Sequence, residues 1–109
     1  MCGRYSLTTP VESVARLFGF DERPNLAARY NIAPTQNALI VRGCVDGGGV
    51  EGVSIRWGLT PPWAKSLDEG VPMINARAET VREKPAFRAA YEARRCLAPS
   101  DGFYEWRKT

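Results

Sequence analysis

The chain has 109 residues, enough for one small domain around a single hydrophobic core. Its apolar fraction of 44% and charged fraction of 25% are typical of a soluble globular protein, and its apolar runs are too short for a membrane span. Because the sequence contains no histidine, Ser-His-Asp and Cys-His catalytic arrangements are excluded within this chain.

The formal net charge of +3 is unevenly distributed. Residues 1–54 hold five basic and five acidic residues, whereas residues 55–109 hold ten basic and seven acidic residues. Twelve of the fifteen basic residues are arginine, whose planar fork suits phosphate. This excess is compatible with a nucleic-acid partner, although many cytoplasmic domains share it.

The three cysteines, Cys2, Cys44 and Cys96, lack the C-x-x-C spacing of a zinc or redox site. Their odd number also argues against a disulfide framework and favours a reducing cytoplasm. We therefore expect no metal and no cofactor, and core packing is the default role of Cys96.

The first half of the chain predicts a strand, a helix and a hairpin. Residues 2–7 predict a short strand, and Thr9 is placed to cap a helix that ends at Gly19. Residues 30–35 predict an extended segment that turns at Pro34. Two hairpin strands follow at residues 37–42 and 53–57. The second strand has one apolar face, formed by Val53, Ile55 and Trp57.

Residues 58–64 (GLTPPWA) contain two adjacent prolines and predict a stiff loop that presents Trp63. A rigidly held aromatic side chain costs little entropy to order, which suits stacking on bases or wedging between them. The alternative is that Trp63 covers the hydrophobic core.

The second half predicts two further strands and a helix. Residues 73–79 alternate, so that Asn75 and Arg77 share one face of a strand, which is either a solvated surface or the wall of a site. Residues 80–83 form a capping-box pattern, which predicts a second helix with Phe87, Ala90 and Tyr91 as its buried stripe.

Residues 95–99 and 103–106 predict the last two strands. Glu105 lies between aromatic residues, where desolvation would raise the pKa of its carboxyl group and suit proton transfer. A Glu105 that faces the solvent is the alternative. Together the elements predict one α+β domain over residues 1–109. Its architecture is a mixed or antiparallel β-rich sheet, or an open barrel, with two short helices.

Removal of Met1 would make Cys2 an N-terminal residue with an amine and a thiol on adjacent carbons. Such a group condenses with an aldehyde to an imine, and the thiol then closes a thiazolidine ring. A small terminal residue without a role is the alternative.

Five sequence motifs follow one another along the chain with sensible spacing: MCGR (1–4), NIAPT (31–35), WGLTPPW (57–63), NARAET (75–80) and RCLAPSDGFYEW (95–106). Together they resemble the SOS response-associated peptidase (SRAP) domain. The resemblance implies a sensor that shields abasic sites in single-stranded DNA, with Cys2 as the covalent nucleophile that forms a thiazolidine cross-link.

The resemblance also implies roles for other residues. Asn75 would hold the N-terminal residue and the opened sugar, and Glu105 would handle protons at the amine and the sugar oxygen. The DNA contacts would come from Arg4 and Arg77 at phosphates and from Pro34 and Trp63 at a junction between single-stranded and duplex DNA.

Members of that family continue beyond the Phe-Tyr-Glu-Trp strand and carry a histidine that assists ring opening and cross-link reversal. The resemblance therefore predicts that this chain is the N-terminal part of such a domain, with impaired reversal. An uncovered sheet edge would favour self-association. The expected location is the cytoplasm, at the nucleoid if the source is a bacterium.

The resemblance implies an enzyme with DNA–protein cross-linking, lyase-like and peptidase activities. Two alternatives to the abasic-site function stay open: a thiol-dependent autoproteolytic peptidase, and an inactive fragment of such a domain.

Overall fold

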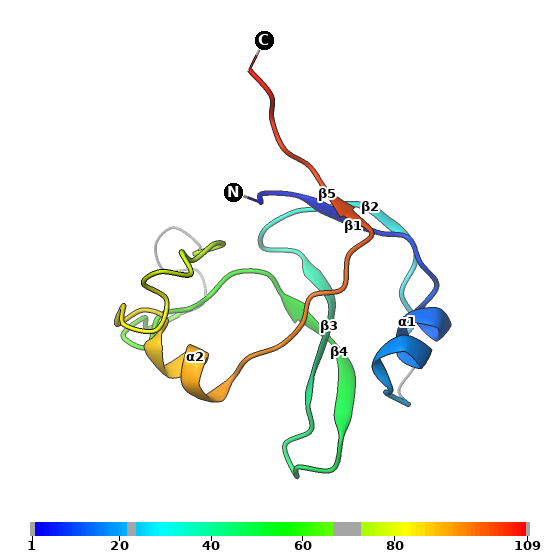
Figure 1. Ribbon diagram of the computed structural model, residues 1–109, viewed down its shortest axis with the longest axis horizontal. Coiled ribbons are helices and arrows are strands. Elements are labelled where there is room, and N and C mark those ends of the chain that lie inside the picture. Colours follow the sequence, from blue (N-terminus) through cyan, green and yellow to red (C-terminus); the bar gives the residue numbers. More distant parts are fainter. Residues whose placement is uncertain (1, 22–23, 67–72, 109) are drawn as a thin grey trace.

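The computed structural model describes residues 2–21, 24–66 and 73–108 (Figure 1). The described residues form two antiparallel sheets and two helices, which confirms the α+β class. Both sheets are open. The elements are, in chain order, β1 (Tyr5–Leu7), α1 (Val11–Phe18), β2 (Arg29–Ile32), β3 (Asn37–Gly43), β4 (Val50–Arg56), α2 (Arg88–Ala93) and β5 (Gly102–Phe103).

The first sheet has the strand order β2-β1-β5, so the N-terminal strand lies in its centre (Figure 1). Tyr5 pairs with Ile32 on one side and with Phe103 on the other. The contact continues beyond the strands, since the amide of Tyr104 donates to the carbonyl of Arg4 at 2.9 Å. The two ends of the described chain are thereby brought side by side.

Helix α1 packs its apolar face against the β3–β4 hairpin. Val14 and Ala15 are buried in one cluster with Phe20, Leu39 and Val41. The helix ends as predicted at Gly19, whose φ of 80° is the left-handed conformation that glycine adopts without strain.

The prediction that Thr9 caps α1 is wrong. Pro10 occupies the cap position, and no side chain caps the helix. The hydroxyl of Thr9 instead donates to the carboxylate of Asp101 at 2.6 Å. A long-range carboxylate has therefore replaced the helix amides as the partner of this hydroxyl.

The hairpin of β3 and β4 is present as predicted, but its buried face is different. Gly52 is buried, whereas Ile55 is 38% exposed. A Cβ at position 52 would lie 2.5 Å from Cε2 of Phe20, so the ring occupies the space that a side chain would need. Within the described residues β4 pairs with β3 alone, and self-association through an uncovered edge stays a prediction.

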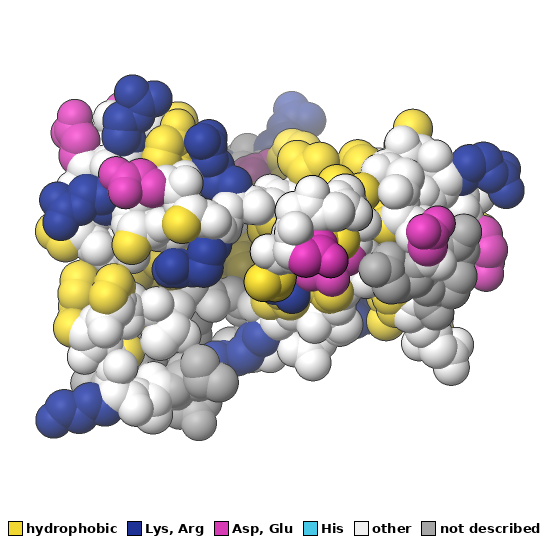
Figure 2. All heavy atoms as spheres, turned by 90° about the horizontal axis from the view of Figure 1, so that it is seen from below, with side chains coloured by type: hydrophobic (Ala, Val, Ile, Leu, Met, Phe, Trp, Pro, Cys, Tyr) yellow, Lys and Arg dark blue, Asp and Glu magenta, His cyan; other side chains and the backbone are white. Residues whose placement is uncertain are grey.

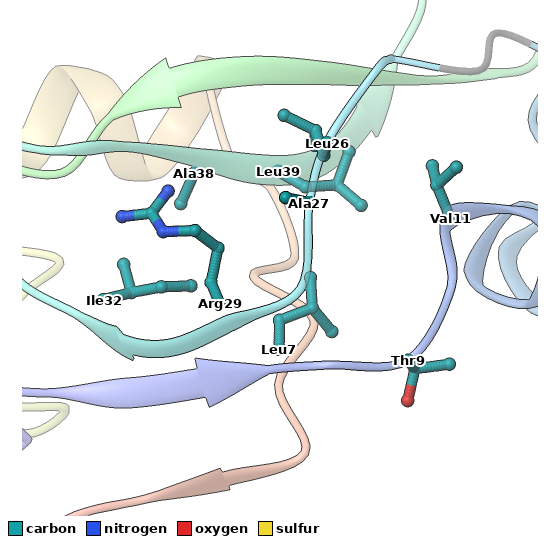
Figure 3. Close-up of a pocket in the computed structure, with 9 residues that line it drawn as sticks. All are labelled: Leu7, Thr9, Val11, Leu26, Ala27, Arg29, Ile32, Ala38 and Leu39. Atoms are coloured by element: carbon teal, nitrogen blue, oxygen red, sulfur yellow. The ribbon is translucent and has the colours of Figure 1, made fainter.

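A small cavity of about 30 Å³ lies between β1, β3 and the segment that follows α1 (Figure 3). Arg29 borders it together with apolar side chains. The guanidinium of Arg29 donates to the carbonyl of Asn37 at 2.9 Å and to Oε1 of Gln36 at 2.8 Å. Arg29 thus connects β2 to the start of β3. The cavity itself is about the size of one water molecule.

The strand predicted at 73–79 is not formed. Met73 makes one bridge, with Leu59, and the residues after it are irregular or in turns. Side chains take the places of a partner strand here: the indole of Trp57 binds the carbonyl of Ile74, and Asn75 binds the carbonyl of Cys2.

The helix predicted from residue 80 begins only at Arg88, and α2 has no buried residue. Separate turns close at Val81, Lys84 and Arg88, and Pro85 has no amide hydrogen to continue a helical ladder. The predicted buried stripe is therefore absent.

The last two predicted strands are shortened. In 95–99 only Leu97 pairs, with Val41, and Pro99 cannot donate the next hydrogen bond. The strand predicted at 103–106 is reduced to Gly102–Phe103, because its partner β1 begins only at Tyr5. In the part of the chain that the structure describes, neither helix has the length and apolar character to cross a membrane.

Candidate functional site

A cavity of about 740 Å³ lies beside the N-terminal residues. Its lining is mostly apolar and comes from both sheets, from the loop after β4 and from the segments before and after α2. Cys2, Asn75 and Glu105 line it, together with the second cysteine Cys96. Concave apolar surfaces with a few convergent polar groups are typical of binding sites.

Asn75 holds the backbone of Cys2 in this cavity. Its Nδ2 donates to the backbone carbonyl of Cys2 at 2.7 Å, across 73 positions of sequence. Cys2 itself is half-buried and packs against the cluster of Tyr5, Ile32 and Ala38. Its thiol donates to the carbonyl of Arg4 at 3.6 Å. An amide at position 75 supplies the donor that the carbonyl needs, and a carboxylate would not.

Trp57 holds the segment that carries Asn75. Its Nε1 donates to the carbonyl of Ile74 at 3.1 Å. Its ring packs edge-on against Tyr5, with ring centroids 5.5 Å apart. The amide of Leu59 adds a bond to the carbonyl of Met73 at 2.8 Å. Sequence reasoning placed Trp57 on a hairpin face and at the start of the motif WGLTPPW, but gave it no part in the site. Its place in that motif was the signal that could have found it.

Tyr5 contributes a phenol to the cavity that the thiols of Cys2 and Cys96 also line. Burial raises the pKa of its hydroxyl, and the charge of Arg29 opposes that shift. The charges of Cys2 and Cys96 raise the pKa further. The hydroxyl therefore stays protonated in the physiological range. Cys96 is exposed and lines the cavity, so the default assignment to core packing is wrong.

Glu105 is exposed and not enclosed between aromatic side chains, since its neighbour Trp106 is 94% exposed. The structure agrees with the solvent-facing alternative. Glu105 nevertheless borders two hollows: the main cavity and an adjacent one of about 470 Å³ that Arg4 and Asn31 also line. It therefore lies where the two open spaces meet.

The predicted DNA contacts are spread over the surface. Arg4 is exposed in the adjacent hollow next to Glu105. Trp63 is 61% exposed on the loop after β4, so it does not cover the core. Pro34 is half-buried in the turn after β2, and Arg77 is exposed at the end of the irregular segment. Neither hollow is lined by Pro34, Trp63 or Arg77.

Asp101 fastens the segment before β5 to the end of β1. Its carboxylate accepts from the hydroxyls of Thr8 and Thr9 at 2.8 and 2.6 Å, and from the backbone amides of both residues. These bonds lower the pKa of Asp101 to about 2, and the bond from the Thr9 hydroxyl has the largest effect. Sequence reasoning placed Asp101 only in a turn. No group of side chains within the described ranges is arranged to hold a metal ion.

The chain matches the family described as "SOS response associated peptidase (SRAP)" over residues 1–109. It is 43% identical to the abasic site processing protein YoaM of Bacillus subtilis, in an alignment that covers 99% of this chain and 48% of that protein. It is 28% identical to the abasic site processing protein HMCES of Mus musculus, covering 99% of this chain and 37% of that protein.

A crystal structure of a protein from Bordetella bronchiseptica has the same fold, with a TM-score of 0.74 at 25% identity. The match covers 95% of this chain and 50% of that one. The chain thus spans about half the length of YoaM and of this neighbour. These matches confirm the resemblance that the five sequence phrases indicated.

Proposed function

Because this chain belongs to the SRAP family, and its relatives are named abasic site processing proteins, we propose that it captures abasic sites in DNA through Cys2. The observation that carries the proposal is the bond from Asn75 to the Cys2 carbonyl, inside a cavity that Glu105 also lines. It supports a site in which the backbone of an N-terminal cysteine is held still while its amine and thiol react.

The proposed reaction begins with removal of Met1, which lies outside the described residues. The amine of Cys2 adds to the aldehyde carbon of the ring-opened sugar, and one water leaves to give an imine. The thiol then adds to the imine carbon, and its proton passes to the nitrogen. The net change joins an aldehyde and an aminothiol into a thiazolidine and one water.

The other groups of the cavity have separate parts in this proposal. Asn75 orients the terminal residue, and Glu105 accepts and returns protons at the amine and the sugar oxygen. Tyr5, which also lines the cavity, offers a protonated hydroxyl. The exposed position of Glu105 is compatible with this part, because the proton donor must face the bound sugar, which enters from solvent.

Single-stranded DNA is the proposed substrate, because an abasic sugar in a flexible strand can reach a concave site without unpairing a duplex. Arg4 lies within the adjacent hollow and would bind the phosphate next to the lesion. Trp63 and Pro34 would stack against bases, and Arg77 would bind a second phosphate. In a bacterial cell this substrate would place the protein at the nucleoid.

The proposal is tested with single-stranded oligonucleotides that carry one abasic site, resolved on a denaturing gel. The expected result is a covalent product with the wild-type chain and none with Cys2→Ala. Cys44→Ala, which removes a thiol outside the cavity, should form the product normally. A missing product in the wild type, or an undiminished product in Cys2→Ala, would contradict the proposal.

The same samples separate the peptidase alternative. Cys2→Ser retains an amine and a nucleophilic hydroxyl but cannot form a thiazolidine. Turnover of a peptide substrate by the wild type, lost in Cys2→Ser, together with an absent DNA product, would favour the peptidase.

A further inference from the structure

The net positive charge of the chain resides in one segment. Residues 77–95 contain six basic and three acidic residues, and the rest of the chain contains nine of each. This segment therefore accounts for the whole formal net charge of +3. Figure 2 shows Lys and Arg side chains gathered at the left end of the molecule, the end that carries α2 in Figure 1.

Three side chains of this segment form a compact unit, which we call the arginine platform: Arg82, Tyr91 and Arg95. The guanidinium carbon of Arg95 lies 4.4 Å from the centroid of the Tyr91 ring, and that of Arg82 lies 5.7 Å from it. Arg82 also approaches the Tyr91 hydroxyl at 3.5 Å. Two like charges are thus held around one ring at the surface.

The surroundings leave this charge uncompensated. Among the described residues, no carboxylate forms a salt bridge with Arg82 or Arg95. The hydrogen bond and charge of Arg82, followed by the charge of Arg95, lower the pKa of the Tyr91 hydroxyl. Both arginines are exposed. An aromatic ring that orders two guanidinium groups lowers the entropy cost of binding an anion.

The platform adjoins the cavity of Cys2 through the chain itself. The basic segment starts two residues after Asn75 and ends directly before Cys96, and both of these residues line the cavity. A polymer held in the cavity therefore has the charged segment next to it. A linear polyanion fits this arrangement, because its charges repeat along a chain that leaves the cavity.

We propose that Arg82 and Arg95 bind successive phosphates of the single DNA strand that flanks the abasic site, with Tyr91 as the positioning residue. The inference rests on the proposed function, since it assigns the path of the same substrate beyond the cavity. The platform contributes affinity without sequence preference, because phosphate contacts carry no base information.

The test measures binding of a lesion-free oligothymidine by fluorescence anisotropy at several salt concentrations, in a Cys2→Ala background. Each phosphate contact on a single strand contributes about 0.7 to the slope of log affinity against log salt. Arg82→Gln and Arg95→Gln should each reduce the slope by about 0.7, and the double variant by about 1.4. Arg16→Gln, an equal change of charge on the exposed face of α1, should leave the slope unchanged.

Tyr91 provides a separate readout of positioning. Tyr91→Phe keeps the ring and should bind like the background protein, whereas Tyr91→Ala should weaken binding with an unchanged charge. Thermal melting of all variants should agree, because these side chains lie at the surface.

The inference would be overturned by an unchanged slope in the double variant, by an equal loss in Arg16→Gln, or by the absence of salt-dependent DNA binding in the background protein. A double variant that loses binding to phosphatidylserine vesicles but not to DNA would also overturn it. Because the oligonucleotide lacks an aldehyde and Cys2 is absent, failure here leaves the cross-linking proposal standing. If cross-linking fails, the salt dependence of binding to the lesion-free oligothymidine still tests the platform, because that binding does not require Cys2.

Discussion

The wall of the cavity and the arginine platform are built in opposite ways. In the wall, two side chains are fixed by directional hydrogen bonds: Asn75 to the Cys2 carbonyl and Trp57 to the Ile74 carbonyl. The platform lies on turns and on α2, which has no buried residue, and its parts are held by charge and ring contacts at the surface. A reaction at a single atom requires side chains that are held in fixed positions, as in the wall. Attraction of a polymer with repeating charges tolerates the looser arrangement of the platform.

The comparison predicts the largest effect at Asn75. Asn75→Asp replaces the donor by a carboxylate that repels the Cys2 carbonyl, so the terminal amine and thiol are no longer held in place. We expect the rate of cross-link formation to fall by about tenfold to a hundredfold, since leaving the partly buried Cys2 carbonyl without its donor costs about 1–3 kcal/mol. Time courses on denaturing gels measure the rate, and the exposed Asn25→Ala should react normally.

Substitutions that crowd the packed hairpin should lower the stability of the fold, whereas substitutions in the platform should not. Gly52→Ala places a methyl group against Phe20, and we expect a loss of about 1–3 kcal/mol in the free energy of unfolding. Gly43→Ala is the matched control, because its Cβ would meet its nearest neighbour, the Gly49 carbonyl, at 4.0 Å. Urea denaturation measures both, and equal midpoints would show that Phe20 moves aside freely.

Trp57 tests whether the position of Asn75 depends on the hydrogen bond that holds its segment. Trp57→Phe keeps an aromatic ring near Tyr5 but removes the donor to the Ile74 carbonyl. We expect about 1 kcal/mol less stability and a slower cross-link, as Asn75 loses its support. Trp106→Phe, at a position 94% exposed, should leave the melting temperature unchanged. A Trp57→Phe protein with wild-type stability and rate would show that the indole nitrogen has no positioning part.

The smallest predicted effect concerns pH. The pKa of Asp101 is about 2 in the folded chain against an ordinary value of 3.8, so its bonds to Thr8 and Thr9 contribute stability fully above pH 3.8. That contribution is lost as the pH falls from there towards 2. Melting temperatures should therefore drop more steeply in this window for the wild type than for Asp101→Asn. Parallel curves would contradict the assignment, and Glu12→Gln is the surface control.

The elements that could be predicted from the sequence are those whose signals are local. Helix α1 ends at Gly19 because glycine alone adopts that backbone conformation without strain. The hairpin of β3 and β4 and the extended segment before Pro34 follow from apolar alternation and turn residues. The motif phrases likewise identified the family from the sequence.

Tertiary contacts decided the rest. Alternation at 73–79 predicted a strand, but among the described residues this segment has no partner strand. The Ile74 carbonyl and the Asn75 side chain bind Trp57 and Cys2 instead, and these bonds place Asn75 in the cavity. The helix predicted from residue 80 begins only at Arg88, because Pro85 has no amide hydrogen to continue a helical ladder. The meeting of Cys2 and Glu105 depends on the pairing of β1 with β5. Sequence alone determined which groups the chain carries, because chemistry is local. Only the folded chain decided which of them share one cavity, because residues that are far apart in the sequence become neighbours only through tertiary contacts.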